Sequence, residues 1–179
     1  MDIETICLAE PDVTAREDDL IGAVLRVLGL AVTVVRQRVA PMEPGFDAVT
    51  FDQFDAVLPR TDWLILACPL TDRTRGLVDR AALQRLPAGA RLVNVARGEV
   101  VDEAALIDAL RAGQLGGAYL DVFAHEPLAA TSPLWSLPNV IATPHSAGFS
   151  DGNAARVVDI FLDNLRRWSA GDTLRNRVD

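Results

Sequence analysis

The sequence predicts an α/β fold built on a parallel β-sheet. Short apolar runs alternate along the chain with segments in which apolar residues recur at the spacing of an α-helix. Residues 63–68 are apolar without a break, which is typical of a strand that is buried on both faces of a parallel sheet. Because such runs are followed by helical segments, we expect consecutive β-α-β units.

The first 36 residues predict one β-α-β unit. Thr14-Ala15-Arg16-Glu17 has the pattern of a capping box, so we expect a helix to begin at Ala15. An apolar stripe follows, and Gly29 is well placed to end this helix. The other elements expected here are strands at residues 5–8 and 31–35, a connection with Pro41 and Pro44, and a short helix around residues 52–58.

The rest of the chain repeats the β-α unit. Asp79 and Asp102 precede helical segments as N-caps, and Pro87 ends the first of these helices. Ser150 is expected to open a long helix that Gly171 ends. The strands are expected at residues 63–68, 91–95, 118–122 and 139–142. We predict one domain over residues 1–179, with a β-α-β start at 1–36 and a C-terminal helix and tail at 151–179.

Composition and charge argue against several kinds of partner. The net charge is −8 and the basic residues do not cluster, so no nucleic-acid partner is expected. The longest apolar stretch, residues 21–35, contains Arg26 and is too short to cross a membrane. Cys7 and Cys68 lie within apolar runs, which favours buried thiols over a disulfide or a metal site. Residues 1–4 lack the positive start of a signal peptide, so we expect a soluble cytoplasmic protein.

Three predicted strands lead to residues that suit the reduction of a carbonyl group. Arg97, Glu126 and His145 each follow a different strand, and ligands of an open parallel sheet bind beyond the carboxyl ends of its strands. Arginine can hold a carboxylate through two parallel hydrogen bonds. Histidine can donate a proton to a developing alkoxide, and a carboxylate beside it favours the protonated ring. These three residues are therefore the candidate catalytic set.

Each residue of this set also has an ordinary structural explanation. Arg97 could be a surface ion-pair partner, Glu126 a loop carboxylate before Pro127, and His145 a cap for the following turn. For each residue taken singly, the structural explanation is the commoner one. Their joint placement at neighbouring strand ends favours the catalytic interpretation.

Three long motifs resemble those of the D-isomer-specific 2-hydroxyacid dehydrogenases, in the order of that family. They are VNVARGEVVDE at residues 93–103, LDVFAHEPL at 120–128 and LPNVIATPH at 137–145. The resemblance extends over residues 62–179. It implies a Rossmann-like, doubly wound parallel sheet and an oxidoreductase that uses NAD or NADP. The implied reaction is hydride transfer between that cofactor and a small 2-oxo or 2-hydroxy acid.

The resemblance implies a role for each matching residue. Arg97 would bind the carboxylate and carbonyl of the 2-oxo acid. His145 would be the proton donor and acceptor, and Glu126 would be the carboxylate that pairs with it. Asp121 would lie near the carboxamide of the nicotinamide. The other residues implied to line the cofactor are Pro69, Thr71, Val95, Ala96, Ala147 and Gly148.

The glycine-rich loop that binds the pyrophosphate of the cofactor in this family is missing. The pattern G-x-G-x-x-G is expected between the first strand and its helix, where residues 9–14 read AEPDVT. If Gly22 is matched to the third glycine, Glu17 and Asp19 take the other two positions. The carboxylates of residues 17–19 stabilise the start of a helix but repel phosphate. We therefore do not expect a pyrophosphate bound there in the usual way.

Most of the substrate-binding domain of the family is also absent from this sequence. Residues 1–36 either derive from the first β-α-β unit of that domain or are a diverged start of the cofactor domain, and the sequence leaves both interpretations open. Under the second, Arg36 and Arg38 follow the second strand, where arginine favours the 2′-phosphate of NADP. Under the first, they are only solvated basic residues.

The last helix predicts a homodimer. In the family this helix passes across to the substrate-binding domain, so here its apolar face should be exposed. We expect a second copy of the chain to cover that face. The stripe comprises Ala154, Val157, Val158, Phe161, Leu165 and Trp168, widened by Ile160 and Leu162.

Two hypotheses for the function follow. The first is an enzyme that transfers hydride between NAD(P)H and a small 2-oxo acid. The second is a non-catalytic relic of the family that folds and dimerises but binds no dinucleotide. The retained motifs favour the first hypothesis, and the missing glycine loop favours the second.

Overall fold

The computed structural model describes residues 4–8, 17–36 and 47–175. The chain divides into two compact units, Met1–His145 and Ser146–Asp179, and each unit is described by itself. The single domain expected over residues 1–179 stays a prediction.

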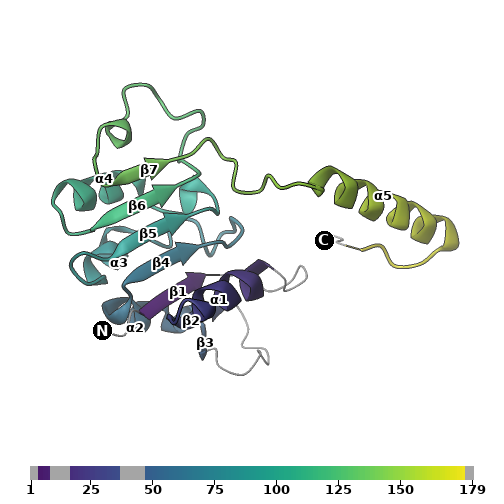
Figure 1. Ribbon diagram of the computed structural model, residues 1–179, viewed down its shortest axis with the longest axis horizontal. Helices are drawn as coiled ribbons and strands as arrows, with labels where there is room; N and C mark the ends of the chain where they lie inside the picture. The colour runs from purple at the N-terminus through teal and green to yellow at the C-terminus, as the bar shows by residue number, and fades with distance from the viewer. Residues whose placement is uncertain (1–3, 9–16, 37–46, 176–179) are drawn as a thin grey trace. The chain divides into compact units, whose positions relative to one another are not determined.

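The first unit is built on one parallel β-sheet (Figure 1). Among the described residues, seven strands pair in the order β3-β2-β1-β4-β5-β6-β7. The direction of winding reverses between β1 and β4, and such a switch point is where open α/β sheets bind ligands. The strands are β1 (Glu4–Leu8), β2 (Ala31–Arg36), β3 (Asp47–Thr50), β4 (Trp63–Leu66), β5 (Arg91–Asn94), β6 (Gly117–Leu120) and β7 (Val140–Ala142).

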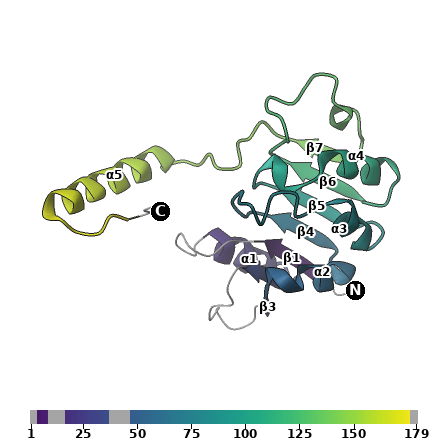
Figure 2. The ribbon, with the colours of Figure 1, turned by 180° about the vertical axis from the view of Figure 1, so that it is seen from behind.

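Helices connect the strands as the sequence predicts. The helix α1 lies on one face of the sheet and α3 and α4 lie on the other, as the two opposite views show (Figures 1 and 2). Asp79 caps α3 by accepting the amide of Ala82 at 2.8 Å, and Asp102 caps α4 by accepting the amide of Ala105 at 3.0 Å. The helices of this unit are α1 (Glu17–Val27), α2 (Phe54–Val57), α3 (Arg80–Arg85) and α4 (Glu103–Arg111).

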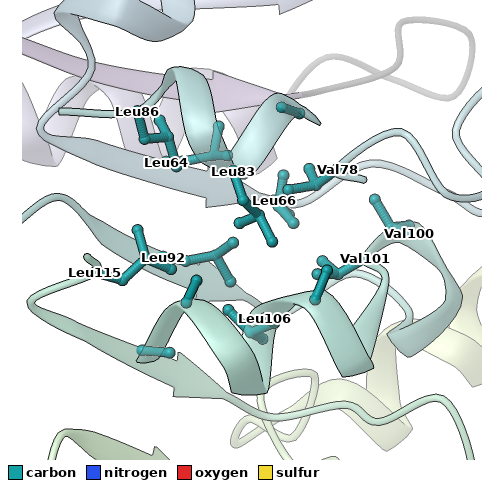
Figure 3. Close-up of a cluster of buried hydrophobic side chains, with 14 of the residues drawn as sticks. Leu64, Leu66, Val78, Leu83, Leu86, Leu92, Val100, Val101, Leu106 and Leu115 are labelled. Atoms are coloured by element: carbon teal, nitrogen blue, oxygen red, sulfur yellow. The ribbon is translucent and has the colours of Figure 1, made fainter. Parts of the chain in front are cut away.

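The core of this unit lies between β4, β5 and the two helices α3 and α4. Leu64, Leu66 and Leu92 of the strands are fully buried against Leu83 of α3 and Leu106 of α4 (Figure 3). A core of this kind is close-packed and holds its strands rigidly. The loops that leave the carboxyl ends of these strands therefore start from fixed points.

The order of the strands bears on the origin of the first 36 residues. β1 pairs with β2 on one side and with β4 on the other, so it lies inside the same sheet as the strands that carry the family motifs. This arrangement favours the interpretation of residues 1–36 as a diverged start of the cofactor domain. Gly29 ends the α1 segment as expected, with φ +80° and its amide donated to the carbonyl of Arg26 at 2.8 Å. The expected capping box from Thr14 lies outside the described residues.

The sequence prediction was incomplete between β2 and β4. It missed β3, a short strand at the edge of the sheet, because Asp47–Thr50 carries only brief apolar character. The short helix predicted around residues 52–58 is present in a shorter form. It is α2 flanked by two 3-10 turns, η1 (Phe51–Gln53) and η2 (Leu58–Arg60), the second with Pro59 in its first turn.

The second unit contains α5 (Asn153–Ala170), which begins later than expected. The prediction that Ser150 opens this helix was wrong. Gly152, at φ +80°, is the N-cap, and Oγ of Ser150 accepts a hydrogen bond from Nη2 of Arg156 at 2.6 Å instead. Gly171 ends the helix with φ +76°, as expected.

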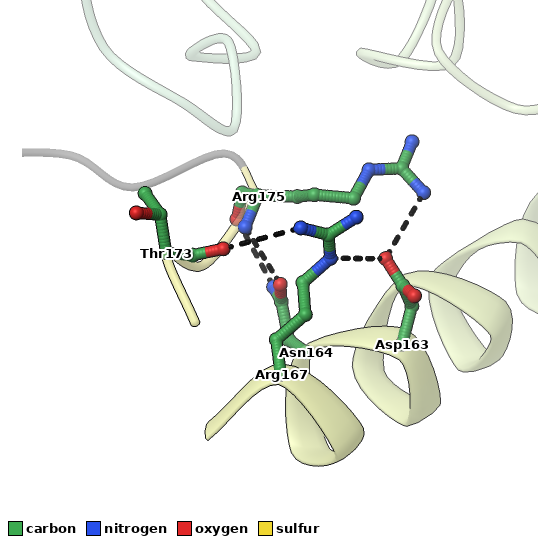
Figure 4. Close-up of polar contacts among 5 residues, drawn as sticks. All are labelled: Asp163, Asn164, Arg167, Thr173 and Arg175. Carbon is green, nitrogen blue, oxygen red and sulfur yellow. Dashed lines mark hydrogen bonds and ion pairs between the residues drawn. The ribbon is translucent and has the colours of Figure 1, made fainter. Parts of the chain in front are cut away.

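The tail that follows α5 folds back onto the helix through polar contacts (Figure 4). Asp163 accepts from Nε of Arg167 at 2.9 Å and from Nη1 of Arg175 at 3.4 Å. Asn164 exchanges two hydrogen bonds with the backbone of Arg175, at 2.7 and 3.0 Å. These contacts hold the segment up to Arg175 against the helix.

Three expectations from composition concern single residues or absences. Cys68 is buried, as predicted, while the side chain of Cys7 lies outside the described part of the chain. None of the described helices is long and apolar enough to cross a membrane. Within the same residues, no group of three or more His, Cys, Asp or Glu side chains is arranged to hold a metal ion.

Candidate active site

Glu126 and His145 meet at the carboxyl end of the sheet. Nδ1 of His145, just beyond β7, lies 2.8 Å from Oε2 of Glu126, in the loop after β6. The second oxygen, Oε1, accepts the amide of Phe123 at 3.0 Å, so both carboxylate oxygens are engaged. The two residues that the sequence paired across 19 positions are therefore in hydrogen-bonding contact.

The surroundings of Glu126 favour its ionised form. Partial burial alone would raise its pKa, but hydrogen bonds from His145 and the amide of Phe123 act in the opposite direction. The charges of His145 and Arg97 add to this effect. The net result is a pKa of Glu126 below the ordinary value of a glutamate, so the carboxylate is charged at neutral pH.

Arg97 reaches the same end of the sheet from the loop after β5. Its side chain is exposed, and Nη1 donates to the carbonyl of Ala96 at 2.6 Å. The loop is shaped by the buried Asn94, whose Oδ1 accepts the amide of Ala96 at 3.0 Å and whose Nδ2 donates to the carbonyl of Arg97 at 3.1 Å. Asn94 was not predicted as a site residue. The sequence feature that could have indicated it is a polar residue at the end of the apolar strand β5.

Gly98 brings the loop of Arg97 against the loop of Glu126. A Cβ atom built on Gly98 would lie 1.9 Å from the carbonyl carbon of Phe123 and 2.3 Å from the amide nitrogen of Ala124. Only glycine allows two backbones to approach this closely. Gly98 lies within the motif at residues 93–103, but this role could not be predicted from the sequence.

Asp121 lies buried beneath the pair. Thr143 donates a hydrogen bond to Oδ1 of Asp121, and the hydroxyl of Tyr119 lies 3.2 Å from the same Oγ1 of Thr143. The backbone carbonyl of Asp121 accepts the amide of His145 at 2.8 Å. His145 has φ +52°, a left-handed conformation that costs energy in a residue with a Cβ and that is found preferentially at functional sites.

Pro69 and Thr71 lie in a compact turn after β4. Oγ1 of Thr74 donates to the carbonyl of Pro69 at 2.7 Å and accepts the amide of Thr71 at 2.8 Å. Thr74 is fully buried, so it fixes this turn from within. Pro69 and Thr71 were predicted as site residues, whereas Thr74, which holds both of them, was not.

The remaining cofactor candidates are spread over three places. Val95 and Ala96 follow β5, where the amide of Val95 donates to the carbonyl of Leu66 at 3.0 Å. Arg36 is buried at the carboxyl end of β2, while Arg38 lies outside the described residues. Ala147 and Gly148 belong to the second unit, so their part in the site stays a prediction.

The start of α1 determines whether a pyrophosphate fits. Residues 9–16, the position of the usual glycine loop, lie outside the described residues. The helix itself starts with Glu17, Asp18 and Asp19, and Gly22 lies buried within it. Backbone amides at a helix start attract phosphate, but three acidic residues in the first turn oppose it.

The sequence matches the model of a known protein family. The model of the D-isomer specific 2-hydroxyacid dehydrogenase, NAD binding domain, matches residues 20–147. The chain belongs to this family. The resemblance seen in the three motifs is thereby confirmed, and with it the Rossmann-like parallel α/β fold of an oxidoreductase family. The match begins after residues 17–19, beyond the first two positions of the missing glycine pattern.

Named 2-hydroxyacid dehydrogenases are similar in sequence. The (S)-sulfolactate dehydrogenase of Chromohalobacter salexigens is 44% identical over 132 residues, which are 71% of this chain and 43% of the relative. Glyoxylate/hydroxypyruvate reductase B of Pectobacterium carotovorum is 39% identical over 144 residues, which are 80% of this chain and 45% of the relative. The chain thus spans less than half the length of these two curated relatives.

Solved 2-hydroxyacid dehydrogenases have the same fold. One from Xanthobacter autotrophicus, in complex with NADPH and MES, superposes with a TM-score of 0.84 at 37% identity, covering 99% of this chain and 71% of that one. An NADPH-dependent glyoxylate/hydroxypyruvate reductase from Sinorhizobium meliloti, with NADP and sulfate, gives 0.86 at 31% identity, covering 98% and 55%. These alignments cover nearly the whole chain, so they include the atypical start of the sheet with β1 and β2.

Proposed function

We propose that this chain forms the cofactor half of an NAD(P)-dependent 2-hydroxyacid dehydrogenase, with Arg97, Glu126 and His145 as its catalytic residues. The observation that supports the proposal most strongly is the 2.8 Å contact between Oε2 of Glu126 and Nδ1 of His145. The positive charge of Arg97 also acts on the carboxylate of Glu126. The same three residue types would otherwise be scattered surface groups. Together they offer a carboxylate receptor and a proton donor at one rim of the sheet.

Each residue has a defined part in the reaction. The guanidinium of Arg97 is exposed and binds the carboxylate and the carbonyl oxygen of a 2-oxo acid. Glu126 holds the ring of His145 through Nδ1, so the proton passes between Nε2 and the substrate oxygen. In the reverse direction the same nitrogen accepts the proton of a 2-hydroxy acid.

The residues at the strand ends suit the nicotinamide end of a dinucleotide. When bound, the dinucleotide supplies or accepts the hydride. Asp121, held by Thr143, would meet the carboxamide, and the turn of Pro69 and Thr71 would lie along the cofactor. The other lining residues are Val95, Ala96, Ala147 and Gly148.

The residues for the other end of the dinucleotide fit less well. Arg36 ends β2, and an arginine after this strand would favour the 2′-phosphate of NADP. The helix α1 begins with Glu17, Asp18 and Asp19, whose negative charges oppose the binding of a pyrophosphate at its start. We therefore propose NADP in preference to NAD, bound mainly through its nicotinamide end and its 2′-phosphate.

The acidic start of α1 also supports a second candidate function. A relic of the family would keep the fold and the motifs but bind no dinucleotide. Titration of NADH and NADPH into the protein, followed by the fluorescence of the reduced nicotinamide, separates the two. Saturation below about 1 mM, the upper range of enzyme affinities, supports the enzyme. Fluorescence that does not change up to several times that concentration supports the relic.

Substrate, assembly and location are further proposals. The names of two relatives suggest small 2-oxo acids, and glyoxylate is a suitable first substrate for assay. The apolar side chains of α5, among them Phe161 and Trp168, are exposed, which supports a homodimer in which a second copy covers them. The cytoplasmic location expected from the sequence stays a prediction.

A further inference from the structure

We infer that Glu103 is a positioning residue for the pair of Glu126 and His145. Glu103 is the first residue of α4 and is half-buried. Its Oε2 accepts the amide of Ala124, 21 residues further along the chain, at 3.0 Å. Ala124 lies in the loop between β6 and Glu126, so the helix is tied to the loop that carries the catalytic carboxylate.

The hydrogen bond of Glu103 acts on one defined peptide unit. The amide of Ala124 and the carbonyl of Phe123 belong to the same planar peptide. Glu103 holds this peptide by its N–H, while Gly98 packs against its carbonyl. A rotation of the peptide would break both contacts at once.

The preceding amide connects this peptide to the catalytic pair. The N–H of Phe123 donates to Oε1 of Glu126, whose Oε2 faces His145. Two successive amides of the loop are thus held by two carboxylates, the one from α4 and the other from the pair itself. If Glu103 releases the peptide, Phe123 loses the orientation in which its amide reaches Glu126.

The same peptide also connects the pair to Arg97. Gly98 follows Arg97 directly and approaches the Phe123 carbonyl too closely to admit a Cβ atom. Glu103 therefore fixes the loop against which the loop of Arg97 rests. Its effect is on the spacing of all three catalytic residues, although it touches none of their side chains in the described contacts.

Two substitutions of Glu103 distinguish the effect of the length of its side chain from the effect of its negative charge. Glu103→Gln keeps a side-chain oxygen at the same distance from the backbone and removes the charge. Glu103→Asp keeps the charge at the start of α4, favourable to the helix, but is one methylene too short to reach Ala124. Glu99→Gln is the matched control, because Glu99 is an acidic residue of the neighbouring turn whose only described ion pair is a 3.9 Å contact with Arg75.

Nuclear magnetic resonance gives two readouts that need no turnover. Amide hydrogen exchange reports whether Ala124 is held, and the side-chain carboxyl signal of Glu126 reports its pKa. In Glu103→Asp we expect exchange at Ala124 to become about tenfold faster or more, as for a lost charge-assisted hydrogen bond. The pKa of Glu126 should then rise toward its ordinary value. Glu103→Gln should change both readouts less than Glu103→Asp does, because its amide oxygen still accepts from Ala124 but without the charge. Glu99→Gln should leave both readouts as in the wild-type protein.

The catalytic meaning of this role rests on the proposed function, but the two can fail separately. If the protein turns over glyoxylate, Glu103→Asp should lower kcat about tenfold or more with little change in the KM for the cofactor. The inference is overturned if Glu103→Asp frees the Ala124 amide while the titration of Glu126 stays unchanged. It is overturned equally if that amide stays protected, or if Glu103→Gln has the larger effect. None of these outcomes depends on cofactor binding.

Discussion

Oε2 of Glu126 lies 2.8 Å from Nδ1 of His145, so the imidazole can address a substrate only through Nε2. The backbone of His145 is fixed at the same time, because its amide donates to the carbonyl of Asp121 at 2.8 Å and its φ is +52°. Side chain and backbone are thus both held by the loop that follows β6. A proton donor fixed in this way needs no reorganisation before it meets a carbonyl oxygen.

Glu126→Gln should weaken the fold more at neutral pH than in acid. The folded-state pKa of Glu126 lies below its ordinary value, because the hydrogen bonds and charges around it outweigh its burial. A group of this kind stabilises the fold above its unfolded pKa of about 4.3, and the stabilisation is lost as the pH falls through the folded-state pKa. The side chain is 34% exposed, so solvent screening limits the effect to about 1 kcal/mol or less.

Urea unfolding of the wild-type protein and Glu126→Gln at pH 7 and pH 3 tests this sign. The difference in the free energy of unfolding should be larger at pH 7 than at pH 3, because the stabilisation is lost as the pH falls through the folded-state pKa of Glu126. A difference of the same size at both values would mean that the carboxylate contributes packing alone.

Gly98→Ala should destabilise the protein by about 2 kcal/mol or more, because its new Cβ would overlap the backbone of Phe123. The two loops would have to separate, and Arg97 would move away from Glu126. Gly148→Ala is the matched control, since a Cβ there meets no atom within 4 Å and no positive φ opposes it. Denaturant unfolding of both variants decides the point. Equal stability of the two would refute the close approach of the loops.

Arg36→Gln should weaken binding of NADPH about tenfold or more and leave binding of NADH within about twofold, as for the loss of one charged hydrogen bond to a phosphate. Fluorescence titration with both cofactors measures the ratio. Arg111→Gln serves as the control, because Arg111 is exposed in the last turn of α4. Equal losses for the two cofactors in Arg36→Gln would argue that the buried arginine supports the fold and not the 2′-phosphate.

The face of α5 should hold two copies of the chain together. Sedimentation equilibrium should find a dimer at micromolar concentration, and the double variant Phe161→Gln with Trp168→Gln should be monomeric, since large aromatic residues dominate interfaces of this kind. Val27→Gln is the control, because Val27 is 87% exposed on α1. A monomeric wild-type protein at that concentration would contradict the proposal.

Regular elements were predictable from the sequence where strong local signals coincide. Asp79 and Asp102 cap their helices as expected, and Gly29 and Gly171 end theirs in the left-handed conformation. The failures lie where tertiary contacts decide. Ser150 has the right type for a cap, but Arg156 engages its hydroxyl. β3 was missed because its four residues gain their order from pairing with β2.

The candidate site divides in the same way. Residues that touch a ligand carry reactive groups, so Arg97, Glu126 and His145 could be named from their types and positions. Residues that only position others have no reactive side chain by which the sequence could identify them. The roles of Asn94, Thr74 and Gly98 depend on contacts with backbone atoms of loops, and those contacts exist only once the chain has folded.

The most direct test of the central claim is the rate at which the protein oxidises NADPH in the presence of glyoxylate, compared with His145→Gln. Binding of NADPH to both proteins is established first by fluorescence, so that loss of rate is not loss of cofactor. We predict turnover by the wild-type protein and a rate at least about 100-fold lower in His145→Gln, the usual effect of removing a general acid. Equal rates, or no turnover by the wild-type protein with NADPH bound, would contradict the assignment of Arg97, Glu126 and His145 as an active site.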